Sequence, residues 1–160
     1  MTLPENSPRL LSALNPVLAY SLGTGMLLLG LHCFLRPRQE YRRFGLPLEH
    51  AQPDTKTRRH SPLIFLKGTR ETTYGLALIL LQYQGNANAV TTMAAVISLA
   101  GLADGLVVWL NGGQELRHKT FGHWFASVVL GCWAAGRAHQ GWENPEERQW
   151  PEGPIHIWST

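Results

Sequence analysis

The sequence predicts an all-α protein, built as an antiparallel bundle of four transmembrane helices. Charged residues make up 16% of the 160 residues, whereas an average soluble domain has roughly 25%. The apolar residues form four long blocks, and most charges lie between them. None of the blocks alternates with a period of two, so strands are disfavoured. A soluble four-helix bundle is the alternative, but each of its helices would need a polar stripe, which the first and third blocks nearly lack.

The first and third blocks are the most apolar. Residues 17–35 hold no Asp, Glu, Lys or Arg over 19 positions. A bilayer core about 30 Å thick is crossed by roughly 20 apolar helical residues, so this block is long enough to span. Residues 87–110 carry a single charge, Asp104. We therefore expect one spanning helix from each block.

The second and fourth blocks are less regular. Residues 63–83 are long enough to span but carry Lys67, Arg70 and Glu71. Residues 121–136 number only 16, so we expect this helix to extend past Arg137 or to tilt little. Small residues in three of the blocks would let helix backbones approach closely in lipid, although glycine is also simply frequent in membrane helices. They are Gly25, Gly30, Ala94, Ser98, Gly101, Gly105, Gly131 and Ala135.

The distribution of basic residues predicts how the helices are oriented. Basic residues follow the first block rather than precede it, so we interpret this block as an uncleaved anchor and not as a cleavable signal. Nine Lys and Arg residues lie in loops 36–61 and 111–120, against three on the other side: Arg9, Arg137 and Arg148. The positive-inside rule places the nine in the cytosol and both termini opposite. We expect a multi-pass protein of the endoplasmic reticulum membrane.

Ionisable side chains from all four predicted helices fall at a similar depth near the cytosolic side. At 1.5 Å per residue, they lie within roughly 3–13 Å of that face: His32, Lys67, Arg70, Glu71, Asp104 and His123. Within the second helix, Lys67, Arg70, Glu71 and Tyr74 are spaced i, i+3, i+4 and i+7 and so share one face. Lys67 can pair with Glu71, and Arg70 can reach Asp104. Buried membrane charges of this kind are functional-site hypotheses by default.

Three other interpretations of these residues stay open. A buried ion-pair network can serve only to fix helix register, and Lys67 and His123 can snorkel to the interface. His32 and His123 are lone histidines on apolar helices, for which a purely structural role is favoured. A zinc site from His32, His123, Asp104 and Glu71 lacks a tight ligand motif such as H-x-x-x-H, so we expect no metal and no cofactor.

The chain divides into a four-helix membrane domain, residues 1–138, and a polar tail, residues 139–160. We expect Trp142, Trp150 and Trp158 to anchor the tail at the membrane interface. Residues 41–48, which mix arginines with apolar residues, are expected to lie along the cytosolic surface. A net charge of +3 is not a nucleic-acid signature by itself. The expected partners are the lipid bilayer and a lipophilic small molecule, with a homo-oligomer as an open alternative.

Four short segments then point to a family. They are, in order, Arg36-Pro37, Phe44-Gly45-Leu46-Pro47, Lys67-Gly68-Thr69-Arg70-Glu71 and Asp104. In that order they resemble a family of small four-helix integral-membrane proteins, common in fungi and formerly of unknown function, over residues 16–137. The family is similar to membrane epoxide hydrolases and cyclases of polyketide biosynthetic clusters. It commonly has Arg-Asp where this chain has Arg70-Glu71, and the longer acid keeps the charge but shifts its reach.

The resemblance and the charges together indicate epoxide opening. This reaction needs a base that activates water or an internal hydroxyl, and an acid that protonates the departing oxygen. We expect Asp104 to act as base, Glu71 as acid and Arg70 to orient both, by analogy with the Asp–Arg–Asp group of soluble limonene-type epoxide hydrolases. The residues expected to assist or to bind substrate are Lys67, Tyr74, His123 and His32. An isomerase or cyclase that adds no water is one alternative, and a non-enzymatic protein that binds or transports a lipophilic ligand is another.

Overall fold

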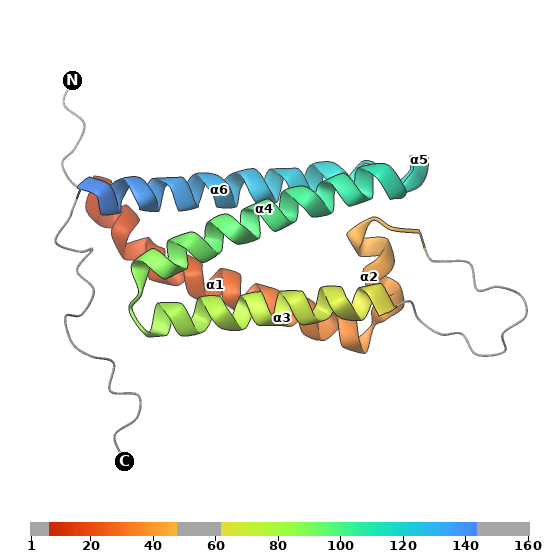
Figure 1. Ribbon diagram of the computed structural model, residues 1–160, viewed down its shortest axis with the longest axis horizontal. Coiled ribbons are helices and arrows are strands. Elements are labelled where there is room, and N and C mark those ends of the chain that lie inside the picture. Colours follow the sequence, from red (N-terminus) through yellow and green to blue (C-terminus); the bar gives the residue numbers. More distant parts are fainter. Residues whose placement is uncertain (1–6, 48–61, 144–160) are drawn as a thin grey trace, which may run out of the picture.

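The computed structural model describes residues 7–47 and 62–143, with side chains for 15–47 and 62–140. These residues are all-helical, which confirms the predicted all-α class. Six helices are present in the described part of the chain (Figure 1): α1 Ser7–Leu35, α2 Pro37–Phe44, α3 Pro62–Tyr83, α4 Ala87–Asn111, α5 Gly113–Leu116 and α6 Lys119–Glu143.

The four long helices alternate in direction and form two pairs. Helix α1 packs along α3, and α4 packs along α6 (Figure 1). The two pairs contact each other mainly through α3 and α4, which are joined by a tight turn at Gly85, where φ is +70°. The start of α1 and the end of α6 lie at the same end of the bundle as this turn, whereas α2 and α5 lie at the opposite end. The helices are therefore antiparallel, as the sequence predicts.

Glycines bring the two helices of the first pair into close contact. A Cβ atom at Gly75 would lie 2.5 Å from the carbonyl oxygen of Gly23, and one at Gly68 would lie 2.9 Å from a Cβ of α1. No side chain fits these positions without a shift of the neighbouring helix, so glycine sets the distance between α1 and α3. Gly25 has open space around it, so the prediction that it lets helices approach is wrong.

Apolar side chains fill the middle of the bundle. The largest cluster of buried residues joins α1, α3 and α4, and consists of Ala19, Met26, Leu78, Val90 and Ile97. A smaller cluster holds α2 against α1 and α3, and consists of Cys33, Tyr41 and Ile64. The second cluster fixes α2 at the end of the bundle where the predicted site residues lie.

Helix α2 turns the chain back against the bundle after α1. It begins at Pro37, since proline fits the first helical position at no cost in hydrogen bonds. It ends at Gly45, whose φ of +105° favours glycine. Residues 41–48 were expected along the surface: Arg42, Arg43 and Pro47 are exposed, whereas Tyr41 is buried, and residue 48 lies outside the described residues. Glu40 and Tyr41 are buried, because they share the face of the helix that is turned toward the bundle.

Within the residues that the structure describes, two helices are long and apolar enough to cross a membrane: Asn15–Leu35 within α1, and Ala87–Asn111. Helix α1 begins ten residues before the predicted block, at Ser7. Helix α6 continues past Arg137 to Glu143, as its short apolar block suggested, and so includes the first five residues of the predicted tail. The tail tryptophans lie outside the residues whose side chains are described.

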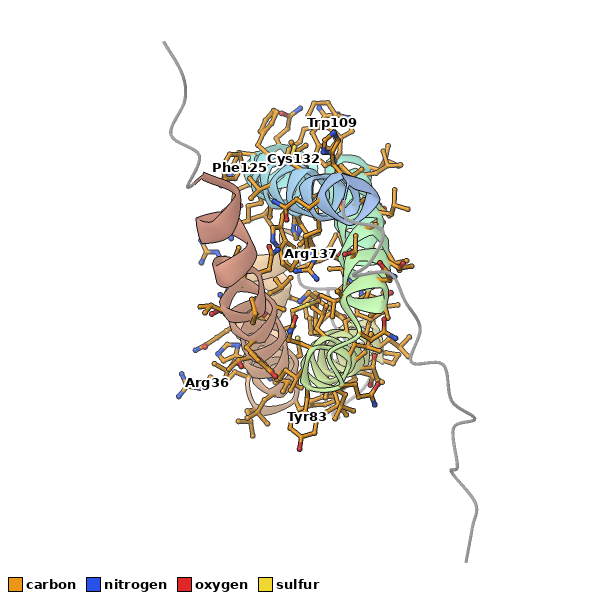
Figure 2. All side chains as sticks on the ribbon, turned by 90° about the vertical axis from the view of Figure 1, so that its left-hand side faces the viewer. Arg36, Tyr83, Trp109, Phe125, Cys132 and Arg137 are labelled. Carbon is orange, nitrogen blue, oxygen red and sulfur yellow. The ribbon has the colours of Figure 1, made fainter. Side chains whose placement is uncertain are left out.

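Large apolar side chains point outward from every long helix. Leu28, Leu66, Leu99 and Phe125, one from each helix, are 62–71% exposed. Figure 2 shows Phe125 and Tyr83 directed away from the bundle. Soluble monomers rarely expose apolar surface on all sides in this way.

Candidate active site

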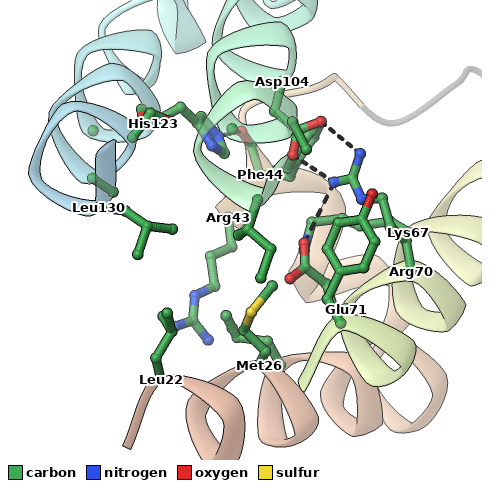
Figure 3. A pocket seen from close by; sticks show the side chains of 18 of the residues that line it. Leu22, Met26, Arg43, Phe44, Lys67, Arg70, Glu71, Asp104, His123 and Leu130 are labelled. Carbon is green, nitrogen blue, oxygen red and sulfur yellow. Dashed lines mark hydrogen bonds and ion pairs between the residues drawn. The ribbon is translucent and has the colours of Figure 1, made fainter. Parts of the chain in front are cut away.

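A cavity of about 540 Å³ lies between the two helix pairs, within the range of about 300–1,000 Å³ that small-molecule sites occupy. Its lining comes from α1, α2, α3, α4 and α6 (Figure 3). Apolar side chains, including Met26, Ile97 and Leu130, form one part of the wall. The ionisable side chains in the lining are Glu40, Arg43, Lys67, Arg70, Glu71, Asp104, Lys119 and His123.

An ion pair between Arg70 and Asp104 joins one helix pair to the other. Arg70 Nη1 donates a hydrogen bond of 2.9 Å to Asp104 Oδ1, and Nη2 donates one of 2.5 Å to Oδ2. The pair is therefore bidentate, the strongest and most directional form of an arginine–carboxylate contact. The Asp104 side chain is only 14% exposed. The prediction that Arg70 reaches across to Asp104 is confirmed.

Glu71 lies on the other side of the same guanidinium. Arg70 Nη2 also donates to Glu71 Oε1 over 3.4 Å, and Lys67 Nζ lies 3.6 Å from that oxygen. The pairing of Lys67 with Glu71 is thus also as predicted. The Lys67 ammonium lies 5.4 Å from the centre of the Phe44 ring, a cation–π contact that holds it at the cavity wall. One guanidinium therefore contacts two carboxylates, and a second cation neutralises the pair.

His123 and Tyr74 line the same cavity. The Nε2 atom of His123 lies 2.8 Å from the carbonyl oxygen of Phe44. A carbonyl oxygen only accepts, so Nε2 carries the proton of this hydrogen bond, and Nδ1 of the neutral ring is an acceptor. The contact ties the end of α2 to α6. Tyr74 packs against the larger apolar cluster and lies on α3, about one turn after Glu71.

A second cavity, of about 280 Å³, lies between α2, α3 and α4. Four residues line both cavities: Phe44, Lys67, Arg70 and Asp104. The Arg70–Asp104 pair therefore borders both. The rest of the second lining is apolar apart from Tyr41, and consists of Leu46, Leu63, Ile64, Leu66 and Val107. Leu63, Leu66 and Val107 are exposed, so the rim of this cavity faces the outside of the bundle.

Glu40 is a cavity residue that the sequence analysis missed. Its side chain is 2% exposed, and it lines the main cavity from α2. Its position among four nearby arginines made this segment look like a charged surface. The signal that could have identified it is helical geometry: between Pro37 and Gly45, residues Glu40, Tyr41 and Phe44 share one face.

His32 does not line the main cavity, unlike the other predicted site residues. Its Nδ1 atom lies 2.6 Å from Glu40 Oε1, and Arg43 Nη1 donates to the same oxygen over 3.4 Å. His32 therefore contacts Glu40, which lines the main cavity, but does not line that cavity itself. Among the described residues, no group of three or more His, Cys, Asp and Glu side chains is arranged to hold a metal ion.

The chain belongs to the family described as "Domain of unknown function (DUF4267)", whose model matches residues 23–137. The match runs from α1 into α6 and includes every charged residue of the cavity lining. No curated protein and no solved structure matches the chain. The family description assigns no activity, so the function has to be argued from the site itself.

Proposed function

We propose that the protein is a membrane-embedded acid/base enzyme that opens an epoxide in a lipophilic substrate, by hydrolysis or by attack of an internal hydroxyl. The observation that carries the proposal is the contact of one guanidinium with two carboxylates in a cavity between helices. Arg70 Nη2 lies 2.5 Å from Asp104 and 3.4 Å from Glu71, and all three residues line the cavity.

The membrane setting rests on the outer surface of the bundle. Helices α1 and α4 are long and apolar enough to span, and α3 and α6 expose large apolar side chains such as Leu66 and Phe125. The charges of α3 are turned inward, into the cavity, and so need not face lipid. We infer that all four long helices span, in the endoplasmic reticulum, with α2 and α5 on the cytosolic side.

The roles of the three charged residues follow from their contacts. Asp104 accepts two hydrogen bonds from Arg70, which orients its carboxylate to take a proton from water or from a substrate hydroxyl. We assign Glu71 as the acid that protonates the departing oxygen; both of its cation contacts are on Oε1, so Oε2 is the oxygen left to carry the proton when a substrate is bound. Arg70 fixes the distance between the two and stabilises the negative charge that develops on that oxygen.

The second cavity offers a path by which a substrate from the membrane can reach Arg70 and Asp104. Its rim faces outward, and its inner end is the Arg70–Asp104 pair. An apolar substrate dissolved in the bilayer reaches the charged group through this cavity without crossing water. Lys67, Tyr74 and His123 line the main cavity and are positioned to bind polar groups of the substrate.

The test is turnover by the purified protein in detergent micelles. One probe is a long-chain alkyl epoxide, and the other is an epoxide that carries an internal hydroxyl. We expect product from at least one of them, and reaction in ¹⁸O-labelled water separates the two reactions. Hydrolysis incorporates the label, whereas internal attack and isomerisation do not.

The variants Asp104→Asn and Glu71→Gln test the two carboxylates, because each replaces the acid by an amide of nearly the same shape. We expect both variants to insert and to remain monodisperse, and both to lose turnover. Wild-type-like activity in either variant would remove that residue from the mechanism. If the wild-type protein opened neither probe while binding both, a lipophilic-ligand-binding role would replace the enzymatic one.

A further inference from the structure

Two cations in the lining of the main cavity, Arg43 and Lys119, have no part in the mechanism above. Arg43 belongs to α2, and Lys119 is the first residue of α6. Figure 3 shows the Arg43 side chain directed into the space between the helices. Lys119 Nζ donates a hydrogen bond of 3.4 Å to the carbonyl oxygen of Arg43, so the two residues meet at one point of the lining.

Most hydrogen-bond donors of these two side chains remain for a ligand. Arg43 contacts Glu40 Oε1 over 3.4 Å, an oxygen that His32 already approaches to 2.6 Å. The Arg43 side chain lines the cavity and is still 63% exposed. Within residues 15–47 and 62–140, Lys119 forms no ion pair. A guanidinium has five N–H donors and an ammonium has three, so the two groups together can bind an anion.

The charge balance of the lining favours an anion with a single charge. Four lysine and arginine side chains line the cavity against three carboxylates, which leaves one excess positive charge when His123 is neutral. Asp104 and Glu71 are paired with Arg70 and Lys67. A carboxylate supplies the one negative charge that is needed, whereas a phosphate monoester carries about −1.5 to −2.

The cavity changes in character along the axis of the bundle. The start of α6, the end of α4 and helix α2 lie at the same end (Figure 1). Asp104 lies seven residues before the end of α4, which is roughly 10 Å deeper. Ile97 and Leu130 lie fourteen residues before that end and eleven after the start of α6, at a depth of roughly 16–21 Å. The cations, the Arg70 group and the apolar wall therefore follow one another along the cavity.

We propose that the substrate is a long-chain carboxylic acid whose carboxylate binds Arg43 and Lys119. Its epoxide then lies at the Arg70 group, roughly 10 Å further along the chain, and its hydrocarbon end packs against residues such as Ile97 and Leu130. Arginine and lysine bind carboxylates through charge-assisted hydrogen bonds. The position of the epoxide rests on the proposed function, whereas binding of the acid does not.

The order of groups in the cavity matches the way such an acid lies in a bilayer. A charged group is costly in the hydrocarbon core, so the carboxylate stays at the interface and the chain extends inward. Arg43 and Lys119 lie at the end of the bundle, and the apolar lining lies toward its middle. Leu63, on the rim of the second cavity, is the second residue of α3. An acid that enters there keeps its orientation.

The first experiment measures binding without turnover, with the full-length protein in non-ionic micelles. The probes are cis-parinaric acid, a fluorescent long-chain acid, and its methyl ester. We expect the acid to bind about tenfold more tightly than the ester, as one charge-assisted hydrogen bond allows. Arg43→Gln and Lys119→Gln should each lower this ratio of affinities by about threefold or more, and the double variant should bring it to about one.

Two variants of α2 serve as controls. Arg42→Gln changes a neighbouring arginine that is 77% exposed, pairs with Glu115 and does not line the cavity, so the ratio should stay at the wild-type value. Arg43→Lys keeps the charge and should keep most of the preference for the acid. A variant that merely disturbed the bundle would weaken both probes and leave the ratio unchanged. An unchanged ratio in the double variant, or a wild-type ratio of one, would overturn the proposal.

A competition arm distinguishes a carboxylate from a lipid phosphate. Palmitic acid should displace bound cis-parinaric acid at a lower concentration than lysophosphatidylglycerol, which carries a single charge on a phosphate beside one acyl chain. Equal displacement by the two would overturn the assignment to a carboxylate.

Turnover then separates this inference from the proposed function. The substrates are the epoxide of oleic acid and its methyl ester, and the ratio of their kcat/KM values should fall in Arg43→Gln as the binding ratio does. If neither epoxide is opened while the binding ratio behaves as expected, the proposed function fails and the acid site stands. If both are opened equally well and the binding ratio is one, the acid site fails and the proposed function stands.

Discussion

The contacts within each helix pair differ in kind from the contacts between the pairs. Within the pairs, small residues allow close approach: Gly75 meets the backbone at Gly23, and Ser98 Oγ donates to the carbonyl oxygen of Ser127 over 2.7 Å. Between the pairs lie a cavity of about 540 Å³ and the bidentate contact of Arg70 with Asp104. The close contacts within each pair stabilise the fold, and the charged side chains lie in the space between the two pairs.

This division explains how four helices keep a charged chamber inside an apolar bundle. If the pairs packed on each other as closely as the helices within them, the charged side chains would have no room. Small residues fix the distance between the helices within each pair. The space between the two pairs can therefore be lined with reactive side chains. Changes between the pairs should therefore affect activity, and changes within a pair should affect stability.

The largest effect is expected from Asp104→Asn, between the pairs. Loss of the base should reduce kcat/KM on a long-chain alkyl epoxide by about 10²–10⁴-fold. The measurement is product formation by the purified protein, with size-exclusion chromatography and circular dichroism as controls for folding. Since an unpaired Arg70 can also destabilise the bundle, Glu71→Gln offers a second test in which the Arg70–Asp104 pair remains.

Arg70→Lys should have the next largest effect. Lysine keeps the charge but lacks the planar fork that contacts both carboxylates, so their relative placement is lost. Displacement of a catalytic group by about 1 Å can cost about 10²-fold, and we expect a loss of that order in kcat. Activity equal to wild type would show that charge alone is sufficient and that the bidentate geometry has no role.

Within the first pair, Gly75→Ala should destabilise the fold by about 1–3 kcal/mol. The added Cβ would lie 2.5 Å from the Gly23 carbonyl oxygen, so α1 and α3 must separate. The matched control is Gly25→Ala, at a helix position with open space around it, which should change stability by less than about 1 kcal/mol. Unfolding in SDS titrations, followed by circular dichroism, measures both. Equal effects at the two positions would contradict the distinction between the interfaces.

The smallest effect is expected from Ser98→Ala in the second pair. It removes one buried hydrogen bond between α4 and α6, a contact worth about 0.6 kcal/mol on average between membrane helices. Thr92→Ala is the control, because the Thr92 hydroxyl bonds only to its own helix and should not hold the pair together. Activity should be unchanged in both variants, as measured with the same epoxide.

Much of this arrangement could be predicted from the sequence. The helix spacing of Lys67, Arg70 and Glu71 fixed their common face, and antiparallel topology brought Asp104 to the same depth. Both inferences depend only on helix geometry, which is local and regular. The all-α class followed from the apolar blocks for the same reason.

Glu40 was missed because its position depends on where a short helix turns. Nothing in the local charge pattern separates a buried glutamate from an exposed one when arginines lie on both sides. Its burial results from Gly45, which ends α2, and from Tyr41, which packs in the cluster with Cys33 and Ile64. For the same reason His32, expected to face the site directly, contacts it through Glu40 instead.

The most direct test of the central claim is whether the two carboxylates act as one unit across the gap between the pairs. The measurement is kcat/KM on one epoxide for Asp104→Asn, Glu71→Gln and the double variant. Residues that work together are strongly non-additive, so each single change should lose about 10²–10⁴-fold and the double variant no more than the worse single one. Losses that simply multiply, or a single variant that keeps wild-type activity, would contradict the account.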